Sequence, residues 1–482
     1  MPKMTLLFYH SLRLPINLSI ILDKHFIGLW LSKTILSSSM ELAIVAVLFS
    51  SLLSTAFAFD PCADSSDLSV IPIYGKCSPF NPPKPASSLI NTVMKLASKD
   101  PERVSYLSSL VAAPPQAPRK GASVVPIAPG QQVLNIGNYV LRAKIGNPGQ
   151  LLFMVLDTSS DAAWVPCNGC TGCAASSAVF TPNASSTYSS LDCSVPECTQ
   201  VRGVSCPATD AATSCSFNQS YGGDSSFSAT LSHDTLWLAN DAIQNYAFGC
   251  INSVSGGSIP PQGLLGMGRG SMSLLSQSGS LYSGVFSYCL PSFKSYYFSG
   301  SLKLGPLGQP KNIRTTPLLK NPHRPSLYYV NLTGVSIGKV QVPIAPEILA
   351  FDPNTGAGTI IDSGTVITRF VQPIYNAIRV EFRKQLKGPF STLGAFDTCF
   401  SATNEDIAPP VVLHFTGMDL VLPMENSLIH SSSGSLACLA MAAAPNNVNS
   451  VLNVIANLQQ QNLRILFDTA NSRLGIAREL CN

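Results

Sequence analysis

Two short segments of the chain each place an aspartate and hydroxyl residues directly after a run of apolar residues. Asp157 is followed by Thr-Ser-Ser, and Asp362, 205 positions later, is followed by Ser-Gly-Thr. When a fold brings two carboxylates within hydrogen-bonding distance, one holds the proton that the other has lost. Such a pair can bind a water molecule, because the ionised carboxylate removes a proton from it while the protonated one donates to a substrate carbonyl. We therefore interpret Asp157 and Asp362 as the two halves of one acid–base site.

The residues after each aspartate can hold its charged form. Ser160 and Thr365 lie three positions beyond their aspartates, where a hydroxyl can donate to the outer carboxylate oxygen. Either segment alone is equally well explained as an Asx turn after a strand. The occurrence of both segments, with matching sequences downstream, favours the shared site.

The matching sequences are two apolar residues followed by a small one. Leu264-Leu-Gly266 ends 109 positions after Asp157, and Val454-Ile-Ala456 ends 94 positions after Asp362. A small residue lets another stretch of backbone pass closely. We therefore expect these segments to run beneath the two acidic turns, in two similar halves that face each other.

The elements that must position the aspartates are short strands. From residue 132 onward, runs rich in Val, Ile, Tyr, Phe and Leu alternate with Gly, Pro, Asn and Ser, which predicts an all-β fold with many turns. We predict a strand at residues 138–145 and the best helix at residues 371–387. Only 12% of residues are charged, which argues against coiled coils. The net charge of +4 without a Lys/Arg cluster argues against nucleic-acid binding.

The N-terminal 58 residues have the pattern of targeting sequence. Residues 40–58 contain an apolar run that ends in Ala56-Phe-Ala, which predicts a signal peptide cleaved after Ala58. We interpret residues 1–39 as an upstream extension, because Met40 alone begins a signal of normal length. An organelle transit peptide or a membrane anchor is the alternative for that segment.

Residues 59–123 are interpreted as a pro-segment. Proline-rich sequences flank residues 88–112, in which apolar residues recur at helical spacing among Lys95, Lys99 and Arg103. We expect the lysines of this helix to enter the acidic cleft as counter-ions and to leave when the carboxylates become protonated. A plain linker is the alternative.

The chain contains 14 cysteines, and behind a signal peptide such a number favours disulfides in a secreted protein. The spacing Cys167-x2-Cys170-x2-Cys173 is compatible with zinc, but no second CxxC or histidine pair follows. Five further cysteines complete this region: Cys193, Cys198, Cys206, Cys215 and Cys250. Three sequons are candidate N-glycosylation sites: Asn183, Asn218 and Asn331.

Four motifs together resemble the pepsin-like aspartic proteases. They begin at Asp157 (Asp-Thr-Ser-Ser-Asp-Ala-Ala-Trp-Val-Pro), Gly263 (Gly-Leu-Leu-Gly-Met-Gly), Asp362 (Asp-Ser-Gly-Thr) and Leu466 (Leu-Phe-Asp-Thr-Ala-Asn-Ser-Arg-Leu-Gly-Ile-Ala). The cysteine-rich region is similar to the insertion of the plant nepenthesin-like group, and the resemblance extends from about residue 132 to the C-terminus. It implies an all-β, bilobal fold with one aspartate in each of two lobes, at residues 124–310 and 311–482.

The resemblance also implies roles for individual residues. Tyr221 matches the tyrosine of a β-hairpin flap over the cleft, and Trp164 matches the tryptophan that donates a hydrogen bond towards it. Two disulfides are implied within and beside the second lobe: Cys399–Cys438 and Cys289–Cys481. The chain departs from the family at Ser159, where the family has glycine as at Gly364, and at Ala456. Because serine keeps the backbone N–H, we expect the site to survive with reduced or unusually selective activity.

The expected function is therefore a secreted, glycosylated endopeptidase of the plant apoplast that works at acidic pH. We expect protein or peptide substrates and inhibition by the protein's own pro-segment. We also expect a monomer without membrane association after removal of the signal, and no metal or other cofactor. The alternative is a catalytically weak or inactive binding protein, because plant inhibitors of cell-wall glycanases use the same fold. Retention of both aspartates favours the enzyme. A serine hydrolase built on Ser225 has no placed histidine partner.

Overall fold

The computed structural model divides the chain into two units, residues 1–60 and 61–482. The expected upstream extension and signal peptide lie outside the described residues, which all belong to the second unit. The structure describes residues 69–72, 89–111, 138–175, 177–206, 213–221, 225–292, 300–307, 309–402, 407–430, 435–445 and 451–481. Among them no helix combines the length and the apolar character needed to cross a lipid bilayer.

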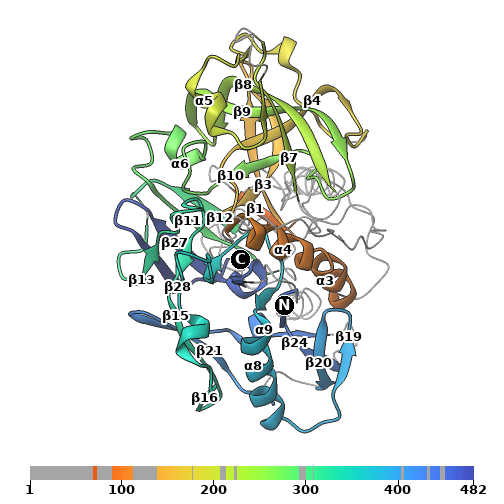
Figure 1. The fold of residues 1–482 in the computed structure, drawn as a ribbon, viewed down its shortest axis with the longest axis vertical. Coiled ribbons are helices and arrows are strands. Elements are labelled where there is room, and N and C mark those ends of the chain that lie inside the picture. Colours follow the sequence, from red (N-terminus) through yellow and green to blue (C-terminus); the bar gives the residue numbers. More distant parts are fainter. Residues whose placement is uncertain are drawn as a thin grey trace, which may run out of the picture. The chain divides into compact units, whose positions relative to one another are not determined.

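Strands dominate the second unit, as the sequence predicts for an all-β chain. They form one 20-stranded sheet and two four-stranded sheets. The strands of the first half are β2 (Tyr139–Ile145), β3 (Gln150–Asp157), β4 (Ala163–Thr171), β5 (Ser189–Ser190), β6 (Val204–Ser205), β7 (Ser216–Ser220), β8 (Ser226–Leu238), β9 (Asp241–Ser255), β10 (Leu264–Gly266), β11 (Val285–Cys289) and β12 (Gly300–Leu304). In Figure 1, β4, β7, β8 and β9 lie in the upper part, and β11 and β12 lie in the middle beside β27 (Leu463–Asp468).

The second half, shown from green to blue in the lower part of Figure 1, contains the two smaller sheets. Its strands are β13 (Arg314–Leu319), β14 (Tyr329–Val330), β15 (Leu332–Ile337), β16 (Val340–Gln341), β17 (Gly358–Ile361), β18 (Thr368–Phe370), β19 (Ser391–Leu393), β20 (Phe396–Ser401), β21 (Val411–Phe415), β22 (Met418–Val421), β23 (Leu428–His430), β24 (Leu436–Leu439), β25 (Met441–Ala443), β26 (Leu452–Ile455), β27 (Leu463–Asp468) and β28 (Arg473–Arg478).

The two halves are joined by hydrogen-bonded strands that come from both. β11 of the first half pairs antiparallel with β12 and with β27, and β28 pairs with β27 and β13. The rings of Phe286 on β11 and Phe467 on β27 stack with their centroids 4.5 Å apart. This shared sheet holds the two halves in one body and fixes how their strand ends face each other.

The segments expected beneath the acidic turns are present as strands. β10 runs parallel to β3 and brings Gly266 opposite Asp157, and β26 runs parallel to β17 and brings Ile455 opposite Ile361. A Cβ atom at Gly266 would lie 2.0 Å from the carbonyl oxygen of Asp161. Ala456 is fully buried, so the second half has room for one methyl group where the first has none.

Most helices of the described residues are short. α8 (Gln372–Lys384) occupies most of the predicted helical range 371–387, and the shorter helices are η2 (Pro182–Ala184), α5 (Pro196–Gln200), α6 (Leu274–Gln277), α7 (Pro346–Leu349), α9 (Met424–Ser427) and η3 (Asn457–Gln460). The helix expected over residues 88–112 is instead two helices, α3 (Leu89–Ala97) and α4 (Asp100–Val111). The break has a local cause, because a residue before proline disfavours the helical conformation whereas proline suits a helix start, and Pro101 is the second residue of α4.

The region interpreted as a pro-segment is packed onto both halves. Its strand β1 (Ser69–Pro72) pairs with β2 and β12. In α3, Ile90, Val93 and Ala97 belong to a buried apolar cluster of the second half. In α4, Val104 and Leu107 belong to another such cluster. Residues 89–111, called the α3–α4 segment below, therefore contribute to the core of the described structure.

Candidate active site

The structure brings the two acidic turns into direct contact. Asp157 ends β3, Asp362 follows β17, and both are fully buried. The backbone N–H of Thr158 donates to the hydroxyl of Ser363 (3.2 Å), and the N–H of Ser363 donates to the hydroxyl of Thr158 (3.0 Å). These reciprocal bonds fix the positions of two turns that are 205 residues apart in sequence.

Each carboxylate is held by equivalent donors from its own turn. The backbone N–H two positions later donates to Oδ1 at 2.9 Å, from Ser159 to Asp157 and from Gly364 to Asp362. The hydroxyl three positions later donates to Oδ2, at 2.9 Å for Asp157 and 2.6 Å for Asp362. The donors of the two Oδ2 atoms are Ser160 and Thr365. This arrangement stabilises an ionised carboxylate in either half.

The two turns differ at their third residue. The Ser159 hydroxyl donates a further bond to Oδ1 of Asp157 at 2.7 Å, a contact that glycine cannot make. At Gly364 a Cβ atom would lie 2.8 Å from Oδ1 of Asp157. Neither residue has a positive φ, so a side chain at the third position is compatible with the backbone. Sequence reasoning treated Ser159 only as a possible weakness and did not foresee this bond.

A guanidinium group from α4 lies against both carboxylates. Nη2 of Arg103 is 2.7 Å from Oδ2 of Asp157, and Nε is 3.9 Å from Oδ2 of Asp362. The same Nη2 donates to the Ser159 hydroxyl. The cation beside the carboxylates is thus an arginine, and the expectation that a lysine lies there is wrong for Lys99. Lys99 instead donates to the carbonyl oxygen of Gly257 (3.3 Å) and the hydroxyl of Ser258 (3.0 Å), and the Lys95 side chain lies outside the described atoms.

The reason for an arginine is geometric. A guanidinium carries several donors in one plane on a long side chain, so it can serve two neighbouring carboxylates at once. The Arg103 side chain is 9% exposed, and its guanidinium carbon lies 5.2 Å from the ring centroid of Tyr221. The cation is therefore enclosed between the carboxylates and an aromatic face.

A second charged residue of α4 is buried in the same region. Asp100 accepts the backbone N–H of Val366 at Oδ1 (3.0 Å) and that of Ile367 at Oδ2 (2.9 Å). Its Oδ2 is 3.9 Å from Nε of Arg369, whose Nη2 donates to the carbonyl oxygen of Ala97 (3.1 Å). Sequence reasoning missed these contacts, although Asp-Pro at a helix start and an arginine within the apolar run that follows Thr365 were available signals.

Burial and the Arg103 charge act in opposite directions on the carboxylates. Burial raises the pKa of Asp157, but the Arg103 charge and the bonds from Ser159 outweigh it, so that this pKa lies below its usual value. Burial also raises the pKa of Asp362; Arg103 opposes this rise and the charge of Asp157 adds to it, so that this pKa lies above its usual value. Burial raises the pKa of Asp100 to about 6, although Arg369 and the two backbone donors lower it.

The aromatic residues expected near a flap lie beside the site. Tyr221 directly follows β7, and its ring meets that of Trp164 edge to face, with the centroids 5.4 Å apart. Burial raises the pKa of Tyr221 above its ordinary value, so the phenol is neutral. Ser225, at the other side of this hairpin, is buried and accepts the backbone N–H of Ser258 at 2.9 Å. The Ser225 hydroxyl therefore takes part in a structural hydrogen bond between two loops.

The cysteines of the described residues are paired in six disulfides. Two of them are the pairs that the family resemblance implies, Cys399–Cys438 and Cys289–Cys481. The others are Cys167–Cys250, Cys170–Cys173, Cys193–Cys206 and Cys198–Cys215. The candidate zinc ligands of the Cys167 region are thus oxidised, and a disulfide sulfur is not the thiolate that zinc requires.

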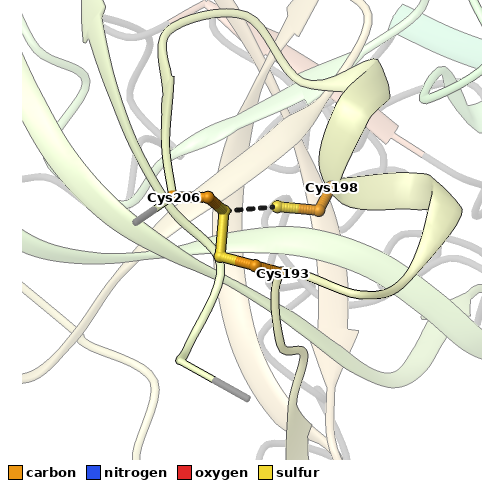
Figure 2. A group of neighbouring side chains, drawn as sticks. All are labelled: Cys193, Cys198 and Cys206. Atoms are coloured by element: carbon orange, nitrogen blue, oxygen red, sulfur yellow. Dashed lines mark hydrogen bonds between the residues drawn. A yellow bond between two sulfur atoms is a disulfide. The ribbon is translucent and has the colours of Figure 1, made fainter. Parts of the chain in front are cut away.

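One group of three cysteine sulfurs is close enough to suggest a metal site. Figure 2 shows the Cys193–Cys206 disulfide with Cys198 pointing towards it. The sulfur of Cys198 lies 3.5 Å from that of Cys206, but Cys198 is itself bonded to Cys215. This group is therefore two adjacent disulfides that brace the cysteine-rich region. Of the sequons, Asn183 and Asn218 are exposed and Asn331 is partly exposed.

Comparisons with known proteins identify the family of this chain. Family models described as the xylanase inhibitor N-terminal and C-terminal domains match residues 139–306 and 327–478. Aspartyl protease AED3 of Arabidopsis thaliana is 64% identical over 92% of this chain and all of its own length. Aspartic proteinase nepenthesin-1 of Nepenthes gracilis is 36% identical, with 72% of this chain and 78% of the relative covered. The chain belongs to the plant pepsin-like aspartic protease family.

The chain also has the bilobal fold of this family. The solved structure of edgp superposes with a TM-score of 0.56 at 19% identity, covering 72% of this chain and 92% of its own. Basic 7S globulin from soybean gives a TM-score of 0.54 at 19% identity, covering 71% and 93%. The all-β, bilobal fold expected from the sequence is confirmed. Asp157 thus belongs to the first lobe and Asp362 to the second.

Proposed function

We propose that this chain is an aspartic endopeptidase that hydrolyses peptide bonds at acidic pH with Asp157 and Asp362 as its catalytic pair. The observation that carries the proposal is the equivalence of the two turns. Each buried carboxylate receives a backbone N–H and a hydroxyl from its own turn, and each turn is bonded to the other. Two neighbouring buried carboxylates do not both ionise freely, so they share one proton.

In the proposed reaction the pair acts on a water molecule bound between the carboxylates. The ionised carboxylate removes a proton from the water, and the water oxygen bonds to the carbonyl carbon of the peptide. The protonated carboxylate gives its proton to the carbonyl oxygen, which produces a tetrahedral diol. The C–N bond then breaks as the nitrogen takes the proton held by the first carboxylate. A diol hydroxyl returns a proton to the second carboxylate.

The hydrogen bonds suggest which carboxylate holds the charge in the resting pair. Asp157 accepts two bonds from Ser159 and one from Ser160, whereas Asp362 accepts one from Gly364 and one from Thr365. Bonds donated to a carboxylate favour its ionised form. We therefore assign the base to Asp157 and the acid to Asp362.

The same proposal gives the α3–α4 segment the role of an inhibitor. Arg103 lies within 4 Å of both carboxylates, where a substrate carbonyl and the attacking water would have to be. Apolar residues of both helices are buried against the second lobe, which supports a docked segment rather than a plain linker. The precursor would be inactive until residues 89–111 leave the cleft.

Several features of the chain support secretion. Residues 40–58 match a signal peptide, the cysteines of the described residues are paired, and two sequons are exposed. We propose the apoplast as the destination, residues 59–123 as the pro-segment, and lobes at residues 124–310 and 311–482 that act as a monomer. Recovery of a processed, glycosylated chain from apoplastic fluid tests this, and retention inside the cell would contradict it.

The catalytic proposal is tested with acid-matured protein and its Asp157→Asn variant. Removing a general base costs about 10³-fold in rate, so the variant should lose nearly all digestion of a protein substrate between pH 3 and 6. The matched control is Asp419→Asn, at a carboxylate that is 59% exposed and belongs to β22. A transition-state peptide inhibitor should stop the native enzyme. Equal digestion by native protein and the Asp157 variant, or none by either, would leave the pepsin-fold binding protein as the function.

A further inference from the structure

The Asp100 carboxylate lies in a group of donors that belong to the second lobe. Two backbone N–H groups, from Val366 and Ile367, donate to its two oxygens at 3.0 and 2.9 Å. Nε of Arg369 is 3.9 Å away and is a buried nitrogen without a hydrogen-bond partner among the described residues. The group therefore contains one cation and two aligned N–H groups around a single carboxylate.

These donors are held in place without the pro-segment. Val366 and Ile367 follow the acidic turn directly, and Arg369 lies in β18 between Thr368 and Phe370. Nη1 of Arg369 donates to the carbonyl oxygen of Ala443 at 2.9 Å, within the parallel pair of β18 and β25. When the α3–α4 segment leaves, Asp100 and the Ala97 carbonyl go with it. A guanidinium edge and two N–H groups then remain without acceptors.

We propose that Val366, Ile367 and Arg369 form a subsite of the cleft that binds an acidic side chain of the peptide substrate. The inference rests on the proposed endopeptidase function and adds a substrate class to it. Aspartate or glutamate would take the place of Asp100, so the pro-segment helix imitates this feature of the substrate. An apolar side chain would leave three donors unpaired, which a site built for hydrogen bonding rejects strongly.

The position of the subsite relative to the bond that is cut follows from α4. Asp100 is three residues, or about 4.5 Å along the helix axis, before Arg103. An extended peptide rises about 3.3 Å per residue, so this distance corresponds to one or two substrate residues. The acidic residue is therefore expected within about two positions of the scissile bond, and the other positions should show no such preference.

Cleavage of matched peptides tests the subsite. Peptides carry glutamate, glutamine or leucine at one position at a time, and kcat/KM is measured at pH 5.5. At one position near the cut, glutamate should exceed glutamine by about tenfold, because a carboxyl group offers an oxygen to each of the two N–H groups whereas an amide leaves one of them unpaired. The Arg369→Gln variant should lose this ratio and Arg369→Lys should keep part of it. The control Arg314→Gln, at an exposed arginine on β13, should keep it whole.

A binding measurement separates failure of the subsite from failure of the protease function. A labelled peptide of residues 89–111 and its Asp100→Asn form are titrated into acid-matured protein at pH 5, and binding is recorded before any cleavage. Native protein should bind the Asp100 peptide about tenfold more tightly, and the Arg369→Gln variant should bind both peptides alike. Equal binding of the two peptides by native protein overturns the subsite whether or not the protein cleaves peptides. Absence of a glutamate preference at every position of an active enzyme also overturns it.

Discussion

The two acidic turns have the same framework and different environments. Both supply a backbone N–H at 2.9 Å to their carboxylate and both add a hydroxyl. The first turn has Ser159, whose hydroxyl gives Asp157 another donor, while the second has Gly364, which leaves space beside Asp157. The framework holds two carboxylates together. Burial raises both pKa values, but Arg103 and the bonds from Ser159 outweigh it at Asp157, whose pKa is lowered, while that of Asp362 stays raised.

The largest expected effect comes from removing the cation that distinguishes the two aspartates. Arg103→Gln in the precursor leaves two buried carboxylates without their counter-ion, and breaking a buried pair costs about 3–5 kcal/mol. Docking of residues 89–111 should weaken by a factor of at least about 10², seen as faster hydrogen exchange of these residues at pH 6. The exchange rate of Arg103→Lys should lie between those of the native precursor and the glutamine variant, because lysine keeps the positive charge but lacks the planar set of donors of a guanidinium. Unchanged exchange in the glutamine variant would contradict the ion pair.

A second change forces the second turn to resemble the first. In Gly364→Ala the added Cβ would lie 2.8 Å from Oδ1 and 3.1 Å from Cγ of Asp157, so the carboxylate must move. Displacement of a catalytic group by a fraction of an ångström to 1 Å costs about 10²-fold, and we expect that loss in kcat/KM of the matured enzyme. The matched variant Ser159→Ala adds no atom and should retain most activity. Equal losses in the two variants would show that the turns do not differ in this way.

A third prediction uses the opposite pKa shifts of Asp157 and Asp100 in the docked state. Burial raises the pKa of Asp157, but Arg103 outweighs it and the net pKa is lowered in the docked state. The docking energy from this ion pair is therefore fully present above the pKa that Asp157 has without the segment. It is lost as pH falls through the lower pKa that Asp157 has in the docked state. Burial raises the pKa of Asp100 to about 6, although Arg369 opposes it and Asp362 adds to it. Its contribution is therefore full below pH 4 and decreases as pH rises through 6.

Docking should consequently be tightest near pH 4 to 5 and weaker on both sides. Asp100→Asn removes one titrating group and leaves Asp362, whose pKa is also raised, so docking of that variant should weaken less between pH 5 and 7, whereas its loss below pH 4 should remain. Hydrogen exchange of residues 89–111 across this pH range provides the measurement. The idea fails if the variant and the native precursor have the same pH dependence.

The smallest expected effect comes from making the first turn like the second. Ser159→Gly removes one hydrogen bond to ionised Asp157, so the pKa of Asp157 should rise and the acidic limb of the kcat/KM profile should move to higher pH. The rate at the optimum should change by less than about tenfold, because the remaining N–H and hydroxyl donors are unaffected. A limb that moves to lower pH would contradict the assigned role of the hydroxyl.

The repeated features of the site could be predicted from the sequence because they are local. A hydroxyl three residues after Asp157 or Asp362 reaches the carboxylate of its own turn. The small residues at Gly266 and Ala456 follow from the close passage of one strand under each turn. An alternation of apolar runs and turn residues was enough to predict strands and the all-β fold.

Other features depend on contacts between distant parts of the chain. The carboxylate of Asp100 meets backbone groups 266 and 267 positions away, and no spacing rule relates them. Arg103 rather than a lysine reaches the dyad because α4 (Asp100–Val111), which lies against both carboxylates, carries Arg103 and contains no lysine. The pairs Cys193–Cys206 and Cys198–Cys215 could not be chosen among the alternatives, since cysteine spacing alone does not define connectivity.

The most direct test of the shared-proton pair is the pH dependence of kcat/KM for acid-matured protein and its two single variants, Asp157→Asn and Asp362→Asn. The native profile should be bell-shaped, with two apparent pKa values that belong to the pair. Each asparagine variant should lose about 10³-fold at the optimum, and its residual rate should no longer follow the bell. A bell-shaped profile of native height in either variant would contradict the account.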